Sequence, residues 1–479
     1  MKMKYILSFF LIFSLHTKSS IFDSRAIVHP EVGVNGMVVS QHYLATDAGQ
    51  SILAAGGNAY DASIAVAFAL AVVLPRAGNI GGGGFMVMFD GATDKTYSID
   101  YREIAPELAT KDMFLAVDGT VDKKRATQGI LSIGVPGTVY GMWEVHQKFG
   151  SLPWDQLLAP AIKLAEDGFL VSPFMADALN ERYDKLSGYK NFKRIFYSDH
   201  PVQMHQRLKQ ESLAKTLKTI SSKGVKGFYE GNVAEKIDNY MKKNGGLITK
   251  NDLKNYRPVW RDTLQGNYHD YEIVTMGPPS SGGIHIIQML NILEKHNLVA
   301  MGHNSPTYTA LLTESMKYAY ADRSEYLGDP GFFDVPVKNL ISKAYAKEIN
   351  KRIELNSITP SDEILPGSAM PPESPDTTHF SVADNDGNVI SNTFTLNSGF
   401  GSGIVIDGTG VLMNNEMDDF VSAPGVPNQF GLIGGEANKI EPFKRPLSSM
   451  TPTLVLQDGK PVFATGSPGG SRIITTVLQ

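Results

Sequence analysis

The sequence lacks cysteine, which occurs at none of its 479 positions. Disulfide bonds and thiolate catalysis are therefore excluded. The absence is compatible with an oxidising compartment but does not require one. The chain is long enough to bury a large core, in two or three domains or in one large layered domain.

A strong excess of charge of either sign is also missing. The 44 Lys and Arg residues oppose 49 Asp and Glu residues, which gives a net charge of −5. Nucleic-acid-binding proteins normally carry a basic excess, so we expect no nucleic-acid partner. Residues 182–226 are moderately basic, but Asp and Glu are interleaved with the basic residues. This pattern favours a solvated helix face over an anion-binding site.

Several familiar catalytic motifs are absent as well. The sequence contains no Gly-x-Ser-x-Gly, no Gly-x4-Gly-Lys-Ser/Thr and no His-Glu-x-x-His. These absences argue against a conventional serine hydrolase, a phosphate-binding loop and a zinc protease of that type. We expect the protein to use neither a cofactor nor a metal.

The N-terminal apolar run is too short for a permanent membrane helix. Lys2 and Lys4 precede an apolar-rich stretch at residues 6–15, and polar residues follow it. This order is typical of a signal peptide. We expect residues 1–24 to be removed on export, with cleavage between about residues 18 and 25. We expect the mature protein to be secreted into a periplasm.

A second apolar run, residues 62–74, predicts a buried core helix. It begins after Asp61 and ends at Pro75, and it is again too short to span a membrane. The mature chain is therefore expected to have no stable membrane span. Residues 78–85 are so rich in glycine that backbone must pack closely against another segment there, and a strand is expected at 86–89.

The remainder of the chain divides at a proline-rich segment. Helical patterns dominate residues 133–260, whereas short strands and glycine turns follow residue 376. Residues 365–375 hold closely spaced prolines, which favour an extended, exposed segment. The segment is either a plain linker or a processing segment that leads into a buried strand.

Two strands are expected on either side of a polar turn at residues 384–388. Apolar and polar side chains alternate in the first strand, which gives it one apolar face. A loop of three or five residues would place Thr377 opposite Thr395, with Cβ atoms roughly 5 Å apart, and Asn397 on the same face. A two-residue turn would instead bring Leu396 opposite Thr377.

Consecutive motifs in this chain resemble the γ-glutamyltranspeptidase family. They occur in the family's order and extend over nearly the whole mature chain, at residues 81–86, 100–103, 277–283, 376–384, 397, 414–420, 444–450 and 466–472. Any one of these motifs would be weak evidence. Their joint occurrence identifies the chain as similar to this family of N-terminal nucleophile hydrolases.

The resemblance implies an α+β protein with a four-layer αββα sandwich and an autocatalytic maturation. Thr377 would attack the carbonyl of Asp376, and hydrolysis of the resulting ester would separate a large subunit, residues 25–376, from a small subunit, residues 377–479. The two subunits would stay together as a heterodimer and form one domain.

The new N-terminus would carry its own base. An α-amino group titrates near pH 7.7–8.0, so about a tenth of it is unprotonated at neutral pH and can activate the hydroxyl of the same residue. His379 projects to the same face as Thr377, but the amine makes a histidine base unnecessary. A structural role for His379 is therefore preferred.

The resemblance also implies a role for each motif residue toward a γ-glutamyl donor such as glutathione. Thr395 would orient the nucleophile, and the backbone N–H groups of Gly469 and Gly470 would form the oxyanion hole. The donor's α-carboxylate would be bound by a cation and two hydroxyls, Arg102, Ser448 and Ser449. Its α-ammonium group would be bound by Asn397, Glu416 and Asp419. Amino acids, dipeptides or water would accept the γ-glutamyl group.

Two alternative functions remain open at this stage. One is an acylase of the same superfamily that cleaves glutaryl or cephalosporin side-chain amides and has no need of an ammonium site. The other is an exported binding protein that never matures. The combination of Asn397, Glu416 and Asp419 favours a γ-glutamyl donor.

The chain departs from the family in two places. Phe430 stands where the family's lid segment, residues 424–444 here, often has tyrosine, so a phenolic hydrogen bond would be lost and gating could be looser. The sequence also stops soon after the oxyanion motif, at Gln479, whereas the family's small subunit continues. We therefore expect a C-terminally truncated chain, in which exposed sheet edges would impair maturation.

Overall fold

A computed structural model of the chain describes residues 30–78, 80–355, 357, 359–361, 364 and 377–479. All described helices and strands belong to one unit, Asn35–Gln479. The predicted signal peptide, the proline-rich segment at 365–375 and Asp376 lie outside the described residues.

The strands of this unit form three antiparallel sheets. A six-stranded sheet has the order β1-β9-β10-β2-β3-β6, a four-stranded sheet has the order β12-β11-β8-β7, and β4 pairs with β5. The strand bounds are β1 Gly36–Val39, β2 Gly83–Asp90, β3 Lys95–Asp100, β4 Phe169–Leu170, β5 Arg207–Leu208, β6 Val259–Arg261, β7 Leu264–Tyr268, β8 Tyr271–Thr275, β9 Thr377–Asp384, β10 Val389–Thr395, β11 Thr453–Gln457 and β12 Lys460–Thr465.

The helices are concentrated before β9, as the sequence predicts for residues 133–260. Their bounds are α2 Tyr43–Ala54, α3 Ala59–Val73, α4 Lys123–Thr127, α5 Thr138–Phe149, α6 Trp154–Asp167, α7 Pro173–Glu181, α8 Tyr183–Leu186, α9 Lys190–Phe196, α10 Glu211–Lys223, α11 Lys226–Tyr229, α12 Gly231–Asn244, α13 Lys250–Asn255, α14 Gly282–Leu293, α15 Leu298–Met301, α16 Pro306–Tyr326, α17 Val337–Leu340, α18 Lys343–Asn350 and α19 Ile473–Leu478. Short 3₁₀ segments include η3 Glu416–Asp419 and η5 Gly470–Arg472.

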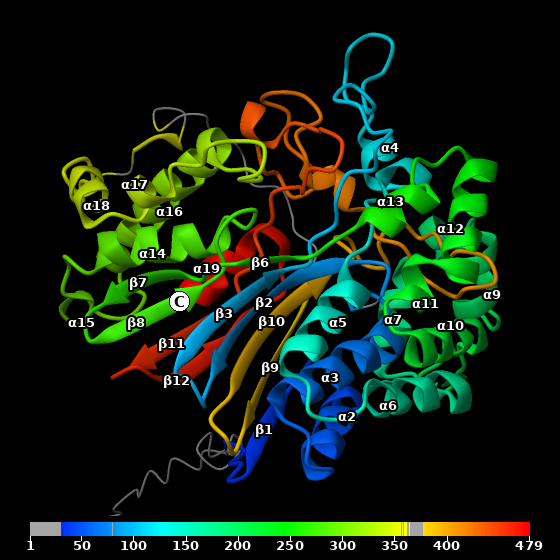
Figure 1. Cartoon of the computed structure of the whole chain (residues 1–479). Helices are drawn as coiled ribbons and strands as arrows, with labels where there is room; N and C mark the ends of the chain where they lie inside the picture. The colour runs from blue at the N-terminus through cyan, green and yellow to red at the C-terminus, as the bar shows by residue number, and fades with distance from the viewer. Residues whose placement is uncertain (1–29, 79, 356, 358, 362–363, 365–376) are drawn as a thin grey trace, which may run out of the picture. The chain divides into compact units, whose positions relative to one another are not determined.

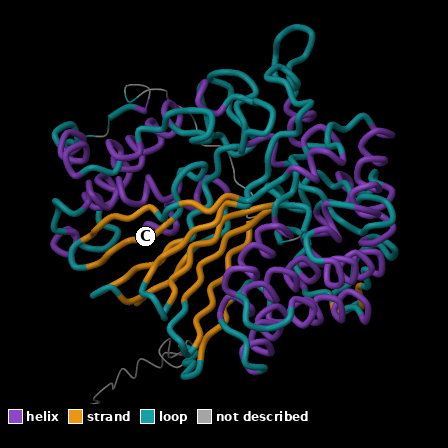
Figure 2. Tube along the Cα trace, in the orientation of Figure 1, coloured by secondary structure: helices purple, strands orange, loops and turns teal. Residues whose placement is uncertain are grey.

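The two large sheets stack between two layers of helices (Figures 1 and 2). Helix α3 packs against β9 and β10 on one side, and α14 packs against β7 and β8 on the other. Between the sheets, side chains of β2 share a buried cluster with side chains of β8 and β11. The order helix, sheet, sheet, helix confirms the predicted αββα sandwich.

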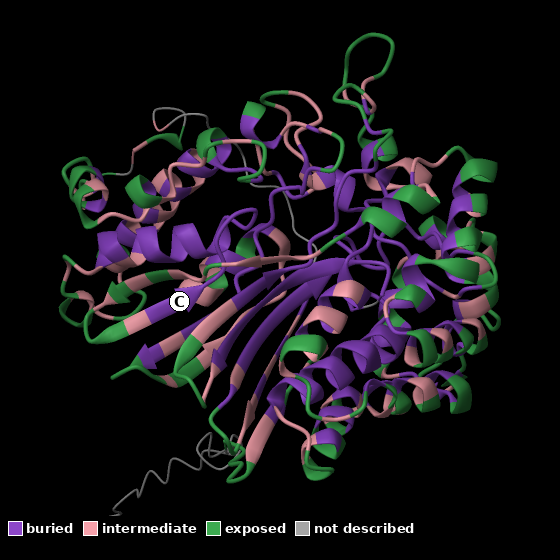
Figure 3. Cartoon of the chain, in the orientation of Figure 1, coloured by how far each residue is buried: buried purple, intermediate pink, exposed green. Residues whose placement is uncertain are grey.

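Strand β2 is buried on both faces, which accounts for its nearly continuous apolar sequence. Met86 and Met88 belong to the cluster on the α3 side, whereas Phe85, Val87 and Phe89 belong to the cluster between the sheets. This alternation is the two-residue period of a strand. Figure 3 shows the buried centre of the sheets and the exposed outer faces of the helices.

Helix α3 is the predicted core helix. Every one of its residues, Ala59–Val73, is buried. The many alanines let neighbouring helices and strands approach it closely, which fits its position between the six-stranded sheet, α2 and α6. Within the described part of the chain, no helix is both long and apolar enough to span a membrane.

The N-terminus of α3 is fixed by a buried carboxylate. Asp61 accepts hydrogen bonds from the backbone N–H of Asn58 at 3.2 Å and from the hydroxyl of Ser151 at 2.5 Å. It also accepts from the backbone N–H groups of Ser151 and Leu152, each at 3.2 Å. Asp61 thus caps α3 and ties the loop before α6 to it.

Replacement of Asp61 by alanine is expected to lower the free energy of unfolding by about 2–4 kcal/mol, because it removes a helix cap and leaves buried N–H groups without an acceptor. Urea denaturation followed by tryptophan fluorescence measures this, since Trp154 packs edge-on against Phe68 of α3. Asp47→Ala, an exposed position on α2, is the matched control and should change stability by less than about 0.5 kcal/mol. Equal effects of the two substitutions would contradict the capping role.

Candidate active site

Four adjacent strands of the six-stranded sheet end or begin on the same side of the sheet. Thr377 begins β9 and Thr395 ends β10, while Gly83 begins β2 and Asp100 ends β3. Antiparallel pairing places these ends side by side, with Thr395 opposite both Thr377 and Gly83. Arg102 follows the end of β3 by two residues, so it lies beside these strand ends.

The glycine-rich turn before β2 packs directly against these strand ends. A Cβ atom on Gly82 would lie 2.0 Å from the carbonyl oxygen of Thr395, and one on Gly81 would lie 2.1 Å from that of Leu412. Only glycine allows this approach. The close backbone packing predicted for residues 78–85 is confirmed, and strand β2 begins at Gly83, three residues earlier than expected.

The β9–β10 hairpin has the register that faces the two threonines toward each other. Thr377 pairs with Thr395, and the pairing continues to Ala383 and Val389. The alternative register, with Leu396 opposite Thr377, is wrong. Asp384 stabilises the turn, because its carboxylate accepts from the backbone N–H and the side-chain amide of Asn388.

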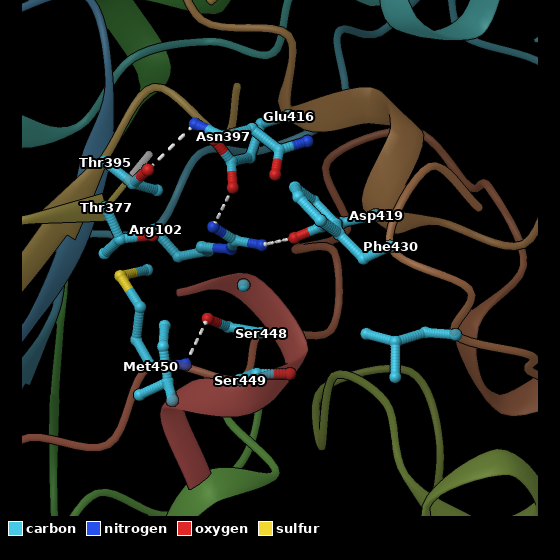
Figure 4. Close-up of a pocket in the computed structure, with 13 residues that line it drawn as sticks. Arg102, Thr377, Thr395, Asn397, Glu416, Asp419, Phe430, Ser448, Ser449 and Met450 are labelled. Atoms are coloured by element: carbon cyan, nitrogen blue, oxygen red, sulfur yellow. Dashed lines mark hydrogen bonds and ion pairs between the residues drawn. The ribbon is translucent and has the colours of Figure 1, made fainter. Parts of the chain in front are cut away.

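A small cavity lies where these strands end (Figure 4). Its lining combines charged, hydroxyl and apolar side chains from segments far apart in sequence, namely Arg102, Thr377, Thr395, Asn397, Glu416, Asp419, Phe430, Leu432, Ser448, Ser449, Met450, Gly470 and Ile473. The residues that sequence motifs singled out therefore gather here, except Gly469, which does not line the cavity, and Asp376, which lies outside the described residues. Sequence reasoning missed Leu432, Met450 and Ile473, which carry no chemical signal beyond being apolar.

Arg102 holds the acidic side of the cavity together. Its guanidinium group forms ion pairs with Glu416 and, at 2.5 Å, with Asp419, both from η3. Its Nε donates to the carbonyl oxygen of Pro446 at 3.2 Å. Burial alone would lower the pKa of Arg102, but the two carboxylates outweigh burial and raise it. Arg102 therefore stays charged and joins three chain segments.

The acidic side carries more carboxyl groups than cations. Glu103, whose Oε2 lies 3.8 Å from Arg102 Nη1, is fully buried, and burial raises its pKa to about 7 although Arg102 opposes the shift. Burial likewise raises the pKa of Glu416, with Glu103 and Asp419 adding to the effect. One guanidinium group thus faces three carboxyl groups, so the cluster either keeps a negative charge or holds a proton.

Two acceptors on this side remain available to a ligand. Among the described residues, Oε2 of Glu416 is buried without a hydrogen-bond partner. The side-chain nitrogen of Asn397 donates to the carbonyl oxygen of Asn415 at 3.0 Å, which leaves the amide oxygen as its acceptor group. The backbone N–H of Asn397 donates to Oγ1 of Thr395 at 2.9 Å and fixes that hydroxyl.

The opposite side of the cavity is formed by Ser448 and Ser449. The turn before α14 holds them, because the backbone N–H of Ser448 donates to the carbonyl oxygen of Pro279 at 2.8 Å and that of Ser281 donates to the carbonyl oxygen of Ser448 at 2.9 Å. The hydroxyl oxygen of Ser448 accepts from the backbone N–H of Met450 at 3.0 Å (Figure 4). The 277–283 motif therefore supports the site without lining it.

The two glycines beside the cavity adopt conformations that other residues disfavour. Gly469 has φ 129° and Gly470 has φ 54°. A Cβ atom on Gly470 would lie 2.9 Å from the ring of Phe430, so the lid segment rests on this turn. Phe430 is buried and covers the cavity as an aromatic side chain.

His379 is engaged by hydroxyl groups on both ring nitrogens. Its Nδ1 lies 2.9 Å from Oγ1 of Thr393, and its Nε2 lies 3.0 Å from Oγ of Ser381. Burial lowers its pKa to about 3, so the ring is neutral. This geometry supports the structural role expected for His379. Within the described residues, no group of three or more Asp, Glu or His side chains is placed to hold a metal ion.

Comparisons with known proteins identify the family of the chain. A family model described as gamma-glutamyltranspeptidase matches residues 45–479. The chain is 50% identical to the glutathione hydrolase proenzyme of Escherichia coli strain K12, over 95% of this chain and 78% of that protein.

Solved structures give the same answer at the level of the fold. A cephalosporin acylase from Bacillus halodurans superposes with a TM-score of 0.83 at 29% identity and covers 96% of this chain and 82% of that chain. Helicobacter pylori gamma-glutamyltranspeptidase superposes with a TM-score of 0.68 at 47% identity and covers 71% of this chain and 97% of that chain. The match over nearly the whole described chain and the high identity to a full-length relative together establish that the chain belongs to the γ-glutamyltranspeptidase family.

Proposed function

We propose that this chain is the precursor of a γ-glutamyltranspeptidase and glutathione hydrolase with Thr377 as its nucleophile. The observation that carries the proposal is the cavity itself. A threonine at the start of a strand faces a second threonine, and the wall beside them has an acidic side and a hydroxyl side. That division matches the ammonium and carboxylate groups of an α-amino acid.

Maturation would begin at the Asp376–Thr377 bond. The Thr377 hydroxyl attacks the carbonyl carbon of Asp376, and the peptide nitrogen leaves as the α-amino group of Thr377. Water then hydrolyses the resulting ester, which restores the hydroxyl and releases the Asp376 carboxylate. Residues 25–376 and 377–479 remain associated as large and small subunits. Residues 1–24 are removed during export to the periplasm.

The mature nucleophile would act in an acyl transfer. The α-amino group of Thr377 removes the proton of its own hydroxyl, which attacks the γ-carbonyl carbon of glutathione or a related amide. Backbone N–H groups of Gly469 and Gly470 stabilise the oxyanion, a type of contribution worth about 3–4 kcal/mol. The amine of the leaving group departs with a proton. Water, an amino acid or a dipeptide then attacks the ester and regenerates Thr377.

Donor recognition would use both sides of the cavity. Glu416, Asp419 and the amide oxygen of Asn397 accept hydrogen bonds from the α-ammonium group, while Ser448, Ser449 and Arg102 bind the α-carboxylate. The unpartnered Oε2 of Glu416 favours a donor with an ammonium group. A glutaryl amide has no such group, which makes an acylase the second candidate despite the fold shared with the Bacillus halodurans enzyme. In the lid, Phe430 supplies apolar cover without a phenolic hydroxyl.

Self-cleavage is the first test of the proposal. Thr377→Ala should leave the chain uncut, whereas the wild-type chain should yield a fragment that begins at Thr377, as read by intact mass and N-terminal sequencing. Thr378→Val is the matched control, because Thr378 points to the α3 side, is buried and has no hydrogen-bond partner for its hydroxyl among the described residues. It should be cut normally. An uncut wild-type chain, or a cut elsewhere, would support a binding protein that does not mature.

Donor selectivity is the second test. Asp419→Asn should lower kcat/KM for a γ-glutamyl anilide about 10–100-fold, because a charge-assisted hydrogen bond to the donor ammonium is worth roughly 1.5–3 kcal/mol. The same variant should change kcat/KM for a glutaryl anilide less than about threefold, since that donor lacks the ammonium group. Asp386→Asn, exposed in the β9–β10 turn, is the control. Faster wild-type cleavage of the glutaryl anilide than of the γ-glutamyl anilide would favour the acylase.

A further inference from the structure

Helix α16 buries a second arginine behind the serine side of the cavity. Arg323 is only 5% exposed. Its Nε donates to Oγ of Ser281 at 3.1 Å, and its Nη2 donates to Oγ of Ser449 at 3.4 Å. Among the described residues, Arg323 has no ion pair with a carboxylate. A buried cation without a paired anion lowers the stability of a fold, and binding of an anion would offset that cost.

The surroundings of Arg323 differ sharply from those of Arg102. Asp419 and Arg102 act on Arg323 only through longer-range electrostatics, in opposite directions, and burial lowers the pKa of Arg323 to about 10. It therefore remains charged at neutral pH. Arg102, in contrast, is directly paired with Glu416 and Asp419. Of Arg102 and Arg323, only Arg323 contributes a positive charge that no adjacent carboxylate among the described residues offsets.

The hydrogen bonds of Arg323 also set the direction in which the serine hydroxyls can donate. Oγ of Ser449 accepts from Arg323, and Oγ of Ser448 accepts from the backbone N–H of Met450. Neither hydroxyl donates to another group among the described residues. A hydroxyl has one hydrogen to donate, so both hydrogens remain for a ligand in the cavity that these serines line. Two free donors backed by an uncompensated cation form a site for an anion.

We propose that Arg323 is a positioning residue for the donor's α-carboxylate, which it binds indirectly by polarising Ser449 and by supplying the unpaired positive charge behind the Ser448–Ser449 pair. The inference rests on the proposed function and deepens it. In this arrangement Arg102, which is paired with Glu416 and Asp419, binds the carboxylate directly together with the two serines, and Arg323 adds positive charge behind Ser449. The ligand class is an α-amino acid with a free carboxylate.

The test combines Arg323 variants with donors that differ by one group. Arg323→Gln should raise KM about 10–100-fold for a γ-glutamyl anilide and for a glutaryl anilide, because both keep the carboxylate. KM for a 4-aminobutyryl anilide, which lacks the carboxylate, should change less than about threefold. Inhibition constants of the same three compounds are measured in parallel, so slow turnover still gives an affinity. Arg323→Lys, which keeps the charge, should restore most of the loss.

Folding and function are read separately. Self-cleavage before Thr377 serves as the check that a variant folds, and Lys338→Gln, an exposed cation on α17, controls for net charge. If Arg323→Gln is not cut, Arg323→Lys carries the test, with a smaller loss of about 3–10-fold that is again confined to donors with the carboxylate. Equal losses for all three donors would overturn the inference. Wild-type protein that is cut but does not cleave the γ-glutamyl anilide would instead overturn the proposed function.

Discussion

The antiparallel pairing of β9 with β10 is the constraint on which the rest of the site depends. It places Thr377 opposite Thr395 where the two strands meet the cavity, and Gly82 packs against the carbonyl oxygen of Thr395 so closely that a side chain would not fit. Because β2 and β3 continue the same sheet, Arg102 lies beside the same strand ends. A large shift of any one of these strands would separate the candidate nucleophile from the groups around it.

Electrostatics divides the cavity into two unlike sides. Three carboxyl groups surround Arg102, so the acidic side has more carboxyl groups than cations. Among the described residues, Oε2 of Glu416 has no hydrogen-bond partner. On the other side, serine hydroxyls with free hydrogens stand in front of Arg323. Such a separation of charge is costly to bury and stabilises no fold by itself. It becomes favourable when a ligand of the opposite polarity, an ammonium group beside a carboxylate, lies across it.

Much of this arrangement could be predicted from the sequence because it depends on local patterns. Alternating side chains and a short polar loop predicted the β9–β10 hairpin and gave the Thr377–Thr395 register as one of two, between which the structure decides. The apolar run at 62–74 identified α3. The αββα fold and the cavity residues followed from motif resemblance, since no periodicity reveals which distant segments meet. Arg323 escaped notice because one arginine on a helix is usually a surface residue, and its burial depends on the packing of α16 against Ser281 and Ser449. The apolar residues that line the cavity were not predicted because an apolar side chain carries no sign of which cavity it lines.

In the proposed mechanism, Thr377 carries the acyl group during turnover. The most direct measurement is the intact mass of the small subunit after rapid acid quenching of the matured protein with a γ-glutamyl donor, followed by fragmentation to locate the modification. The fragment beginning at Thr377 should gain the mass of one γ-glutamyl group, attached to Thr377 itself. A γ-glutamyl group on any other residue, or turnover without a covalent intermediate, would contradict this mechanism.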